Sequence, residues 1–183
     1  MACKATHELL TCTSCRLHNF RNIVVAGHGD PNARIALVGE APGKDEDEQG
    51  EPFIGKAGQH LDMLLGNVGL VRGQLWLTNV VKCRPPSNNL RAYPDAQVTC
   101  PTLWLMPELQ ALPNLKVVVT LGATAGALFF PGHTATEMST LARSWIEGYC
   151  AIGAFHPSYS LREGEWVARS IEASLRRALT YAA

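Results

Sequence analysis

Four cysteines have types and spacing that suit a metal centre. Cys12 and Cys15 form a C-x2-C knuckle, and Cys83 and Cys100 are separated by sixteen residues. The knuckle lets one turn present two sulfurs to the same centre. Four thiolates in two such groups can therefore enclose a zinc ion or an iron–sulfur cluster. The spacing leaves the choice of metal open, and four unrelated buried thiols are the alternative.

An acidic loop provides a second group of reactive side chains. The stretch GEAPGKDEDEQGEPFIGKAG runs from Gly39 to Gly58 and follows an apolar run. It begins like a phosphate-binding loop, but its first thirteen residues carry six carboxylates: Glu40, Asp45, Glu46, Asp47, Glu48 and Glu51. Carboxylates repel a phosphate, which argues against that interpretation. They permit a Mg²⁺ site as an alternative, and we expect Asp45–Glu48 to be mostly a solvated acidic rim.

Basic side chains accompany the second pair of cysteines. The stretch Arg84–Pro94 lies between these cysteines and holds three prolines and three Asn or Ser residues, which is typical of a loop. A metal centre would hold this loop rigid. Lys82, Arg84 and Arg91 lie on or beside the loop and are candidates for contacts with a phosphate backbone. A solvated basic loop has the same composition and is the alternative.

Strands alternating with helices would bring these segments together. Short apolar runs predict buried strands at Arg34–Gly39, Leu75–Val81, Lys116–Leu121 and Tyr149–Phe155. Apolar residues at helical spacing and small residues predict helices at Ala57–Val68, Ala96–Gln110 (capped by Asp95), Ala123–Phe129 and Glu163–Ala182. This alternation is typical of an α/β fold with a parallel sheet and helices on both faces.

The loops that carry unusual residues all follow predicted strands. GEAPG follows the first strand, NVVKCRPP follows the second, and HPSYSLR follows the fourth. In parallel sheets ligands bind at the carboxyl ends of the strands. We therefore expect these three loops to meet at one site.

The composition is that of one ordinary globular domain. The chain has 183 residues, 46% of them apolar and 17% charged, and its net charge is zero. A general electrostatic affinity for nucleic acid is not indicated, so DNA binding would need a local basic patch. No apolar run is long enough to span a bilayer, and the N-terminus lacks the apolar centre of a signal peptide. We expect a cytoplasmic protein in which disulfides are rare. Cys3 and Cys150 lack metal-site spacing, and we expect Cys150 in the core.

Five motifs in order resemble those of a known family. GEAPG followed by Glu46–Asp47, then PFIGKAG, TNVVKCRPP and HPS, with the C-x2-C and C-x16-C spacings, closely resemble the iron–sulfur, or family 4, uracil-DNA glycosylases. The resemblance covers roughly Cys12 to Arg162. It implies a three-layer α/β/α sandwich around a four-stranded parallel sheet. Residues 1–183 would form one such domain, with the N-terminal C-x2-C segment contributing to a [4Fe–4S] cluster. The implied reaction is hydrolysis of the N-glycosidic bond of deoxyuridine in DNA, which releases uracil.

The resemblance also implies roles for individual residues. Phe53 would stack on the flipped uracil, Asn79 would read the pyrimidine edge, and His156 would contact the uracil O2. The cluster ligands would be Cys12, Cys15, Cys83 and Cys100. Backbone groups of three residues would line the pocket and position water: Glu40, Ala41 and Gly43.

The chemistry of uracil agrees with these roles. A base inside a duplex must be rotated into a pocket before it can react. The Asn79 amide can pair with uracil N3–H and O4 together, whereas cytosine would place a donor against a donor. Cleavage leaves negative charge on uracil, which His156 can stabilise at O2. A carboxylate, either Glu40 or Glu46, can stabilise the cationic sugar or orient water. Glu40 is favoured because it follows a strand directly.

HPSYSLR would supply the wedge that fills the hole left by the flipped base. Leu161 is the candidate, with Tyr159 and Arg162 beside it. Tyr159–Ser160 is less apolar than the usual family pattern, which leaves the identity of the wedge open. The predicted contacts with the DNA backbone come from Lys82, Arg84, Arg91 and Arg162.

Other functions remain as alternatives. One relative of this family traps uracil covalently through a histidine in a basic insert near the proline-rich loop. The stretch RPPSNNLRAYPD here has no histidine, so we expect turnover without a stable adduct. A non-catalytic binder of uracil-containing DNA and a Mg²⁺-dependent phosphohydrolase are the remaining alternatives. We expect a monomer that acts on single- or double-stranded DNA and has no membrane partner.

Overall fold

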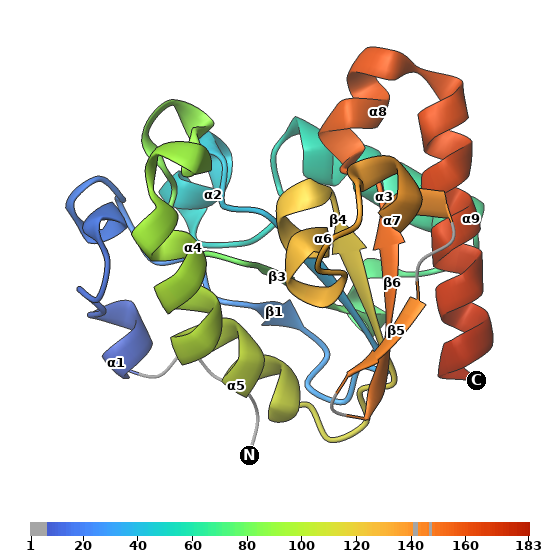
Figure 1. Cartoon of the computed structure of the whole chain (residues 1–183), viewed down its shortest axis with the longest axis horizontal. Helices are drawn as coiled ribbons and strands as arrows, with labels where there is room; N and C mark the ends of the chain where they lie inside the picture. The colour runs from blue at the N-terminus through green and yellow to red at the C-terminus, as the bar shows by residue number, and fades with distance from the viewer. Residues whose placement is uncertain (1–6, 141–142, 147) are drawn as a thin grey trace.

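A mixed sheet forms the centre of the protein. The computed structural model describes residues 7–140, 143–146 and 148–183, and within them the six strands of the sheet have the order β1-β3-β2-β4-β6-β5 (Figure 1). The strands are β1 (His28–Gly29), β2 (Ile35–Gly39), β3 (Trp76–Asn79), β4 (Val117–Leu121), β5 (Arg143–Ile146) and β6 (Tyr149–Ala154). The inner strands β3, β2, β4 and β6 are parallel, and β1 and β5 pair with them antiparallel. The four predicted strands are therefore present, but the prediction of a purely parallel four-stranded sheet is wrong.

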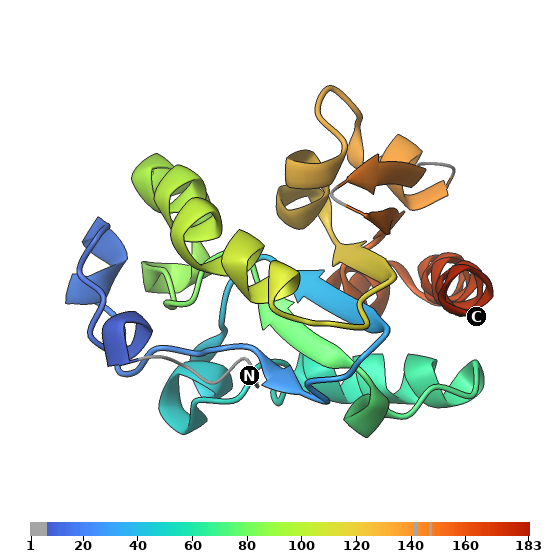
Figure 2. The same ribbon diagram turned by 90° about the horizontal axis from the view of Figure 1, so that it is seen from below.

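Helices cover both faces of the sheet. They are α1 (His7–Leu10), α2 (Lys44–Gln49), α3 (Lys56–Asn67), α4 (Pro94–Cys100), α5 (Met106–Gln110), α6 (Ala123–Phe129), α7 (Ala135–Thr140), α8 (Pro157–Glu163) and α9 (Glu165–Ala182). Short 3-10 turns lie at Arg16–Asn19, Arg72–Gln74, Pro86–Asn88 and Leu90–Ala92, and a π-helical turn at Pro101–Leu105 joins α4 to α5. Figure 2 shows α4 and α5 on one side of the sheet and α3 on the other. None of the described helices has the length and apolar character that a membrane span requires.

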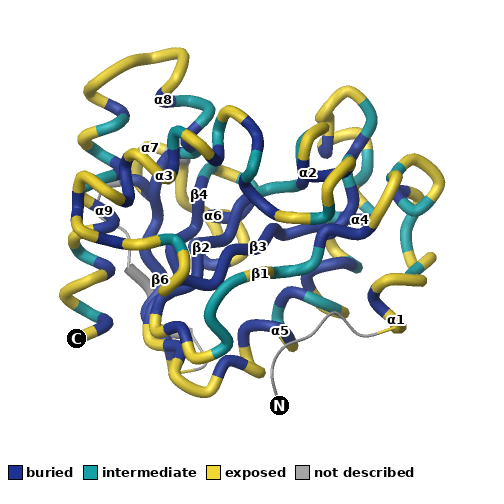
Figure 3. The backbone as a smooth tube through the Cα atoms, turned by 180° about the vertical axis from the view of Figure 1, so that it is seen from behind, coloured by how far each residue is buried: buried dark blue, intermediate teal, exposed yellow. Residues whose placement is uncertain are grey.

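Alternating side chains of the strands build one core on each face. In β4, Val118 packs with α4–α7 residues such as Leu109 and Phe129, while Val117 and Val119 pack with those of α3 and α9. Strand residues point to opposite faces in turn, so a strand buried on both sides is apolar throughout. The inner strands are buried along their whole length (Figure 3). A buried sheet of this kind is a rigid support for the loops at its edge.

Prolines and glycines account for the main differences from the predicted helices. Pro94 takes the first position of α4, so Asp95 lies inside the first turn and does not cap the helix. Pro101 has no N–H to donate, and the helix widens into the π-helical turn there. The predicted helix Glu163–Ala182 is confirmed as α9, which begins two residues later because Gly164, with φ of 85°, separates it from α8. The sequence did not predict α8, which makes HPSYSLR mostly helical.

Candidate active site and metal centre

A pocket of about 600 Å³ opens at the carboxyl ends of the parallel strands. Gly39 and Asn79 lie side by side at the ends of β2 and β3, and Leu121 and Ala154 do so in β4 and β6. The loops after these strands therefore meet, as the sequence predicts. The pocket brings together these predicted residues: Glu40, Ala41, Gly43, Glu46, Phe53, Asn79, His156 and Arg162. It is also lined by residues that the sequence did not single out, including Pro85, Asn88, Gly122 and Ser158.

Asn79 presents a rigidly placed amide to this pocket. It is the last residue of β3 and is 3% exposed. A Cβ added to Gly39 on the neighbouring strand would lie 2.5 Å from Asn79 Oδ1 and 2.6 Å from Phe53 Cζ. Any larger residue at position 39 would therefore push both side chains out of place. Gly39, the first glycine of GEAPG, therefore permits the close approach of the Asn79 and Phe53 side chains to β2.

Phe53 has a strained backbone that its surroundings impose. Its φ is 58°, which is rare for an aromatic residue, and its side chain is 6% exposed. A Cβ on Gly58 would lie 1.8 Å from the Phe53 carbonyl oxygen, so the start of α3 must carry glycine there. The Phe53 ring stacks with that of His156 at a centroid distance of 6.5 Å and an interplanar angle of 30°. Strained residues of this kind cluster at functional sites.

The acidic segment is a helix, α2, and part of it is buried. The prediction of a solvated rim is wrong for Glu46, which is 8% exposed, and for Asp47, which is 2% exposed. Asp47 accepts hydrogen bonds from the backbone N–H and the amide of Asn22. Glu46 Oε1 accepts from the backbone N–H groups of Ile54 and Gly55 at 3.0 and 2.9 Å. These two carboxylates therefore fasten the loops around α2.

We expect Glu46→Ala to destabilise the fold while Glu46→Gln does not. Alanine leaves the N–H groups of Ile54 and Gly55 without their acceptor, which costs about 3 kcal/mol. Glutamine keeps a carbonyl oxygen where Oε1 lies and can accept both bonds. Chemical denaturation of the two variants and the parent measures the difference. Equal stability of the two variants would contradict the positioning role of Glu46 for the Phe53 loop.

His156 is held as a neutral imidazole with a defined tautomer. Its Nδ1 accepts a hydrogen bond from the Ser158 backbone N–H at 3.1 Å, so the ring proton resides on Nε2. Burial, assisted by the charge of Arg162 and opposed by that of Glu46, lowers the pKa of His156 to about 4. At neutral pH the site therefore offers an N–H donor that carries no positive charge.

Glu40 lies at the rim of the pocket with one oxygen already bound. Its Oε2 accepts a hydrogen bond of 2.5 Å from the Thr124 hydroxyl in α6. A carboxylate oriented in this way keeps its other oxygen for a ligand in the pocket. Thr124 is a site residue that sequence reasoning missed, because its partner lies 84 positions away in the chain.

Of the arginines predicted to contact the DNA backbone, only Arg162 lines the pocket. Arg162 is exposed on α8, lies over the Tyr159 ring at 5.6 Å, and lines the pocket. Leu161, the predicted wedge, is on the same helix and is 52% exposed. Arg91 is exposed, and Arg84 is partly buried and donates to Asn88 Oδ1 at 3.1 Å. Neither Arg84 nor Arg91 lines the pocket itself.

The prediction that Lys82 contacts the DNA backbone is wrong. Its side chain is 1% exposed and forms an ion pair with the buried Glu108 of α5. An ammonium group enclosed in this way cannot reach a phosphate outside the protein. Sequence reasoning placed the charge at the surface because lysine is rarely buried unless it is paired.

The four predicted ligand cysteines line one cavity, together with apolar residues such as Leu9 and Val24. Each of two sulfurs accepts a hydrogen bond from a nearby N–H: Cys83 Sγ from Arg21 at 3.2 Å, and Cys12 Sγ from Trp104 at 3.3 Å. Burial raises the pKa of Cys83, and it raises that of Cys100 to about 12. To ionise and act as metal ligands, these two thiols therefore need a cationic partner. Within the described residues, no three such side chains are placed to hold one metal ion. The described cysteines are free thiols; Cys150 is buried in β6, and Cys3 lies outside the described residues.

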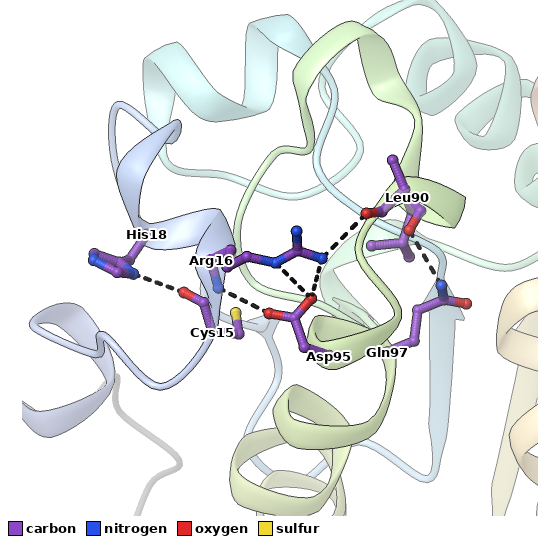
Figure 4. Close-up of polar contacts among 7 residues, drawn as sticks. Cys15, Arg16, His18, Leu90, Asp95 and Gln97 are labelled. Carbon is purple, nitrogen blue, oxygen red and sulfur yellow. Dashed lines mark hydrogen bonds and ion pairs between the residues drawn. The ribbon is translucent and has the colours of Figure 1, made fainter.

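The N-terminal knuckle is docked against α4 by its own contacts (Figure 4). The Arg16 side chain donates to Asp95 Oδ1 at 3.0 Å, and the Arg16 backbone N–H donates to Asp95 Oδ2 at 3.0 Å. The adjacent Leu17 is fully buried in the core on this face of the sheet. Hydrogen bonds from the Arg16 side chain and backbone lower the pKa of Asp95 to about 2. These contacts bring Cys15 next to the helix that ends at Cys100.

Comparisons with known proteins agree on one superfamily. The family model of the uracil DNA glycosylase superfamily matches residues 26–176. A type-4 uracil-DNA glycosylase of Thermotoga maritima is 42% identical over 153 residues, which are 82% of this chain and 78% of the relative. A type-4 uracil-DNA glycosylase of Archaeoglobus fulgidus is 38% identical over 161 residues, with the same two coverages of 82% and 78%. One of Pyrobaculum aerophilum is 34% identical over 165 residues, 86% of this chain and 83% of the relative.

Proposed function

The chain belongs to the type-4 uracil-DNA glycosylases of the uracil DNA glycosylase superfamily, and we propose that it excises uracil from DNA by hydrolysing the N-glycosidic bond. The resemblance stated from the sequence motifs is thereby confirmed at the level of the family. One observation supports the activity most strongly. An amide, an aromatic ring and a neutral imidazole, those of Asn79, Phe53 and His156, line one pocket at the carboxyl ends of the strands.

Recognition of uracil follows from the geometry of the amide. Asn79 donates to uracil O4 and accepts from N3–H, while the Phe53 ring stacks on the base. Because β3 is buried, the amide cannot turn freely to suit a different base. Cytosine would present its N4 donors to the amide donor and leave a buried group without a partner.

Bond cleavage places opposite charges on the two products. His156 donates from Nε2 to uracil O2 and stabilises the leaving anion. Glu40, oriented by Thr124, faces the positive charge that develops on the sugar or orients the attacking water. Both Oε1 bonds of Glu46 go to the Phe53 loop. We therefore assign Glu46 to positioning that loop and Glu40 to the chemistry.

The face around the pocket would hold the DNA. Leu161 on α8 fills the place of the flipped base, and Arg162, Arg84 and Arg91 contact phosphates. The exposure of Leu161 and Arg162 and the position of Arg162 in the lining of the pocket support this arrangement. The protein would act as a monomer on single- or double-stranded DNA.

The four cysteines around the second cavity would hold a [4Fe–4S] cluster. Four cysteine thiolates are the donor set that such a cluster requires. The N–H donors of Arg21 and Trp104 reach two of the sulfurs, as outer hydrogen bonds commonly do at metal sites. The cluster would supply structural cohesion, and no step of the reaction requires it. Because all four ligands line one cavity, residues 1–183 would form a single catalytic domain.

Cleavage of a uracil-containing oligonucleotide tests the function. The purified protein is incubated with single- and double-stranded substrates that contain one uracil, and the products are heated in alkali. Strand breaks at the uracil are expected, together with free uracil in solution. Retention of the DNA without breaks would mean a binder, and a band that survives denaturation would mean covalent trapping.

The pH dependence of the reaction should lack a histidine transition near neutrality. The folded pKa of His156 is about 4, below its ordinary value, so the neutral ring persists as the pH falls until about 4. Protonation of Nδ1 then removes the acceptor for the Ser158 N–H and places a positive charge on the ring. We expect single-turnover rates to show no His156 transition near pH 6.5 and to fall as the pH approaches 4.

The same shift has a consequence for stability. A depressed histidine pKa contributes stability that is present above the unfolded pKa and is lost as the pH falls through the folded one. Circular dichroism at each pH therefore separates unfolding from loss of activity. A rate transition near pH 6.5 that His156→Asn abolishes would contradict the neutral-imidazole assignment.

A further inference from the structure

A buried polar network lies directly behind the pocket. Lys82 Nζ donates to Asn79 O at 3.1 Å and to Thr78 Oγ1 at 2.5 Å, and it pairs with Glu108 Oε2. Glu108 also accepts from Trp76 Nε1 at 2.9 Å and from Thr78 Oγ1 at 3.1 Å. The network therefore joins α5 to the end of β3. One of the acceptors of Lys82 in it is the backbone carbonyl of Asn79, the residue that reads uracil.

Among the described strands, none pairs with that carbonyl. On the outer edge of β3 the antiparallel partner β1 is opposite Trp76 and Leu77 only. On the inner edge the Val80 N–H donates to Gly39 O at 2.8 Å, so the peptide after Asn79 is fixed at its N–H end. Without Lys82 the Asn79 carbonyl would be a buried acceptor beyond the end of the ladder. The lysine ammonium takes the place that a neighbouring strand would otherwise occupy.

The network has no room to rearrange. A Cβ on Gly27 would lie 1.6 Å from Glu108 Oε1 and 2.6 Å from Trp76 Nε1, so backbone closes over the carboxylate. The backbone of Lys82 is itself held, because its carbonyl accepts from the Val25 N–H at 2.8 Å. Residue 82 is thus held by its backbone carbonyl while its ammonium group binds the Asn79 carbonyl.

We propose that Lys82, anchored by Glu108, is a positioning residue for uracil recognition: it fixes the Asn79 carbonyl and thereby aims the Asn79 amide into the pocket. The inference rests on the proposed function of that pocket. A buried ion pair is weak evidence for stability, because desolvation offsets the attraction between the charges. Its effect should appear instead in the discrimination between uracil and cytosine.

Binding to non-cleavable DNA tests this role without requiring turnover. Two oligonucleotides are compared, one with 2′-fluoro-2′-deoxyuridine and one with 2′-fluoro-2′-deoxycytidine at the same position, and the ratio of their affinities is measured. Lys82→Met should lower this ratio about tenfold, the value of one lost hydrogen bond that aims the amide. It should also lower stability, because it removes the ammonium group that compensates the charge of the buried Glu108.

The double variant Lys82→Met/Glu108→Gln separates positioning from stability. Removing both charges together should restore most of the stability, while the affinity ratio stays low because the Asn79 carbonyl still lacks its donor. The visible absorbance of each variant shows that the cluster is retained. A wild-type affinity ratio in the double variant would overturn the proposal.

A core variant on the opposite face serves as the control for instability. Leu175→Ala empties a fully buried site in α9, among the residues that pack with Val119. It should destabilise the protein by about 3 kcal/mol and leave the affinity ratio unchanged. A fall in the ratio with Leu175→Ala would show that instability alone produces the effect, and would also overturn the proposal. A ratio of one in the parent protein would instead overturn the proposed function, and this inference with it.

Discussion

Asn79→Asp is expected to lower uracil excision and to narrow the preference for uracil over cytosine by about 10- to 100-fold, the value of one paired base contact. The substitution keeps the shape of the side chain but replaces the amide donor with an oxygen. In the pocket that oxygen would face uracil O4, so two acceptors would meet where the residue is almost fully buried. Single-turnover cleavage of matched uracil and cytosine oligonucleotides measures both changes.

Asn88→Asp provides the matched control for added charge. Asn88 also lines the pocket but is exposed, and its Oδ1 accepts from Arg84, a bond that aspartate would keep. It introduces the same negative charge without removing a donor from the base-reading position. We expect its preference for uracil to stay close to that of the parent. Equal losses in both variants would show that charge, and not the lost donor, explains the Asn79 result.

Cys83→Ala is expected to abolish cluster binding and to destabilise the fold. The parent should carry iron and the brown absorbance of an iron–sulfur protein. A ligand present at a thousandfold excess over its dissociation constant contributes about 4 kcal/mol, and we expect a loss of at least that size when the cluster is absent. Iron analysis and visible absorbance measure the cluster content, and thermal unfolding measures the stability.

Cys150→Ala is the control for loss of a buried thiol. Cys150 is fully buried in β6, among the residues that pack with α3 and α9, and it does not line the four-cysteine cavity. Its replacement should leave a small cavity, which lowers stability slightly, and should leave the iron content unchanged. A colourless parent that contains stoichiometric zinc would refute the cluster assignment.

Regular apolar patterns made the four inner strands and the long helices predictable, whereas the short edge strands β1 and β5 were not predicted. The strand ending at Leu121 and the helix Ala123–Phe129 lie where the sequence placed them, because continuous apolar runs and small-residue turns carry a local signal. Helix α2 escaped prediction because KDEDEQ has no apolar residue to mark a buried face. Its carboxylates suit the positive end of a helix, and Gly50, with φ of 82°, ends it.

The parts of the site that sequence reasoning missed depend on long-range partners. Lys82 and Glu108 are 26 positions apart, and Thr124 and Glu40 are 84 apart, so no local spacing reveals either pair. Ser158 had a local signal: a Ser two residues after His can turn its backbone N–H toward the ring. Conversely, the pocket residues themselves were predictable because strand ends in a parallel sheet converge.

The docking of the knuckle makes the order of assembly matter. Arg16 and Asp95 are 79 positions apart, so their contact closes a long loop of the chain, and closing a loop of this order costs about 4 kcal/mol of entropy. The burial of Leu17 offsets about 2 kcal/mol of this entropy cost, and the exposed Arg16–Asp95 ion pair contributes little further stability. The cluster would therefore act as a cross-link between the two ends of the loop. The proposed site would be complete only after Cys100 has emerged from the ribosome, when the residues of β1, β2 and β3 have already been synthesised.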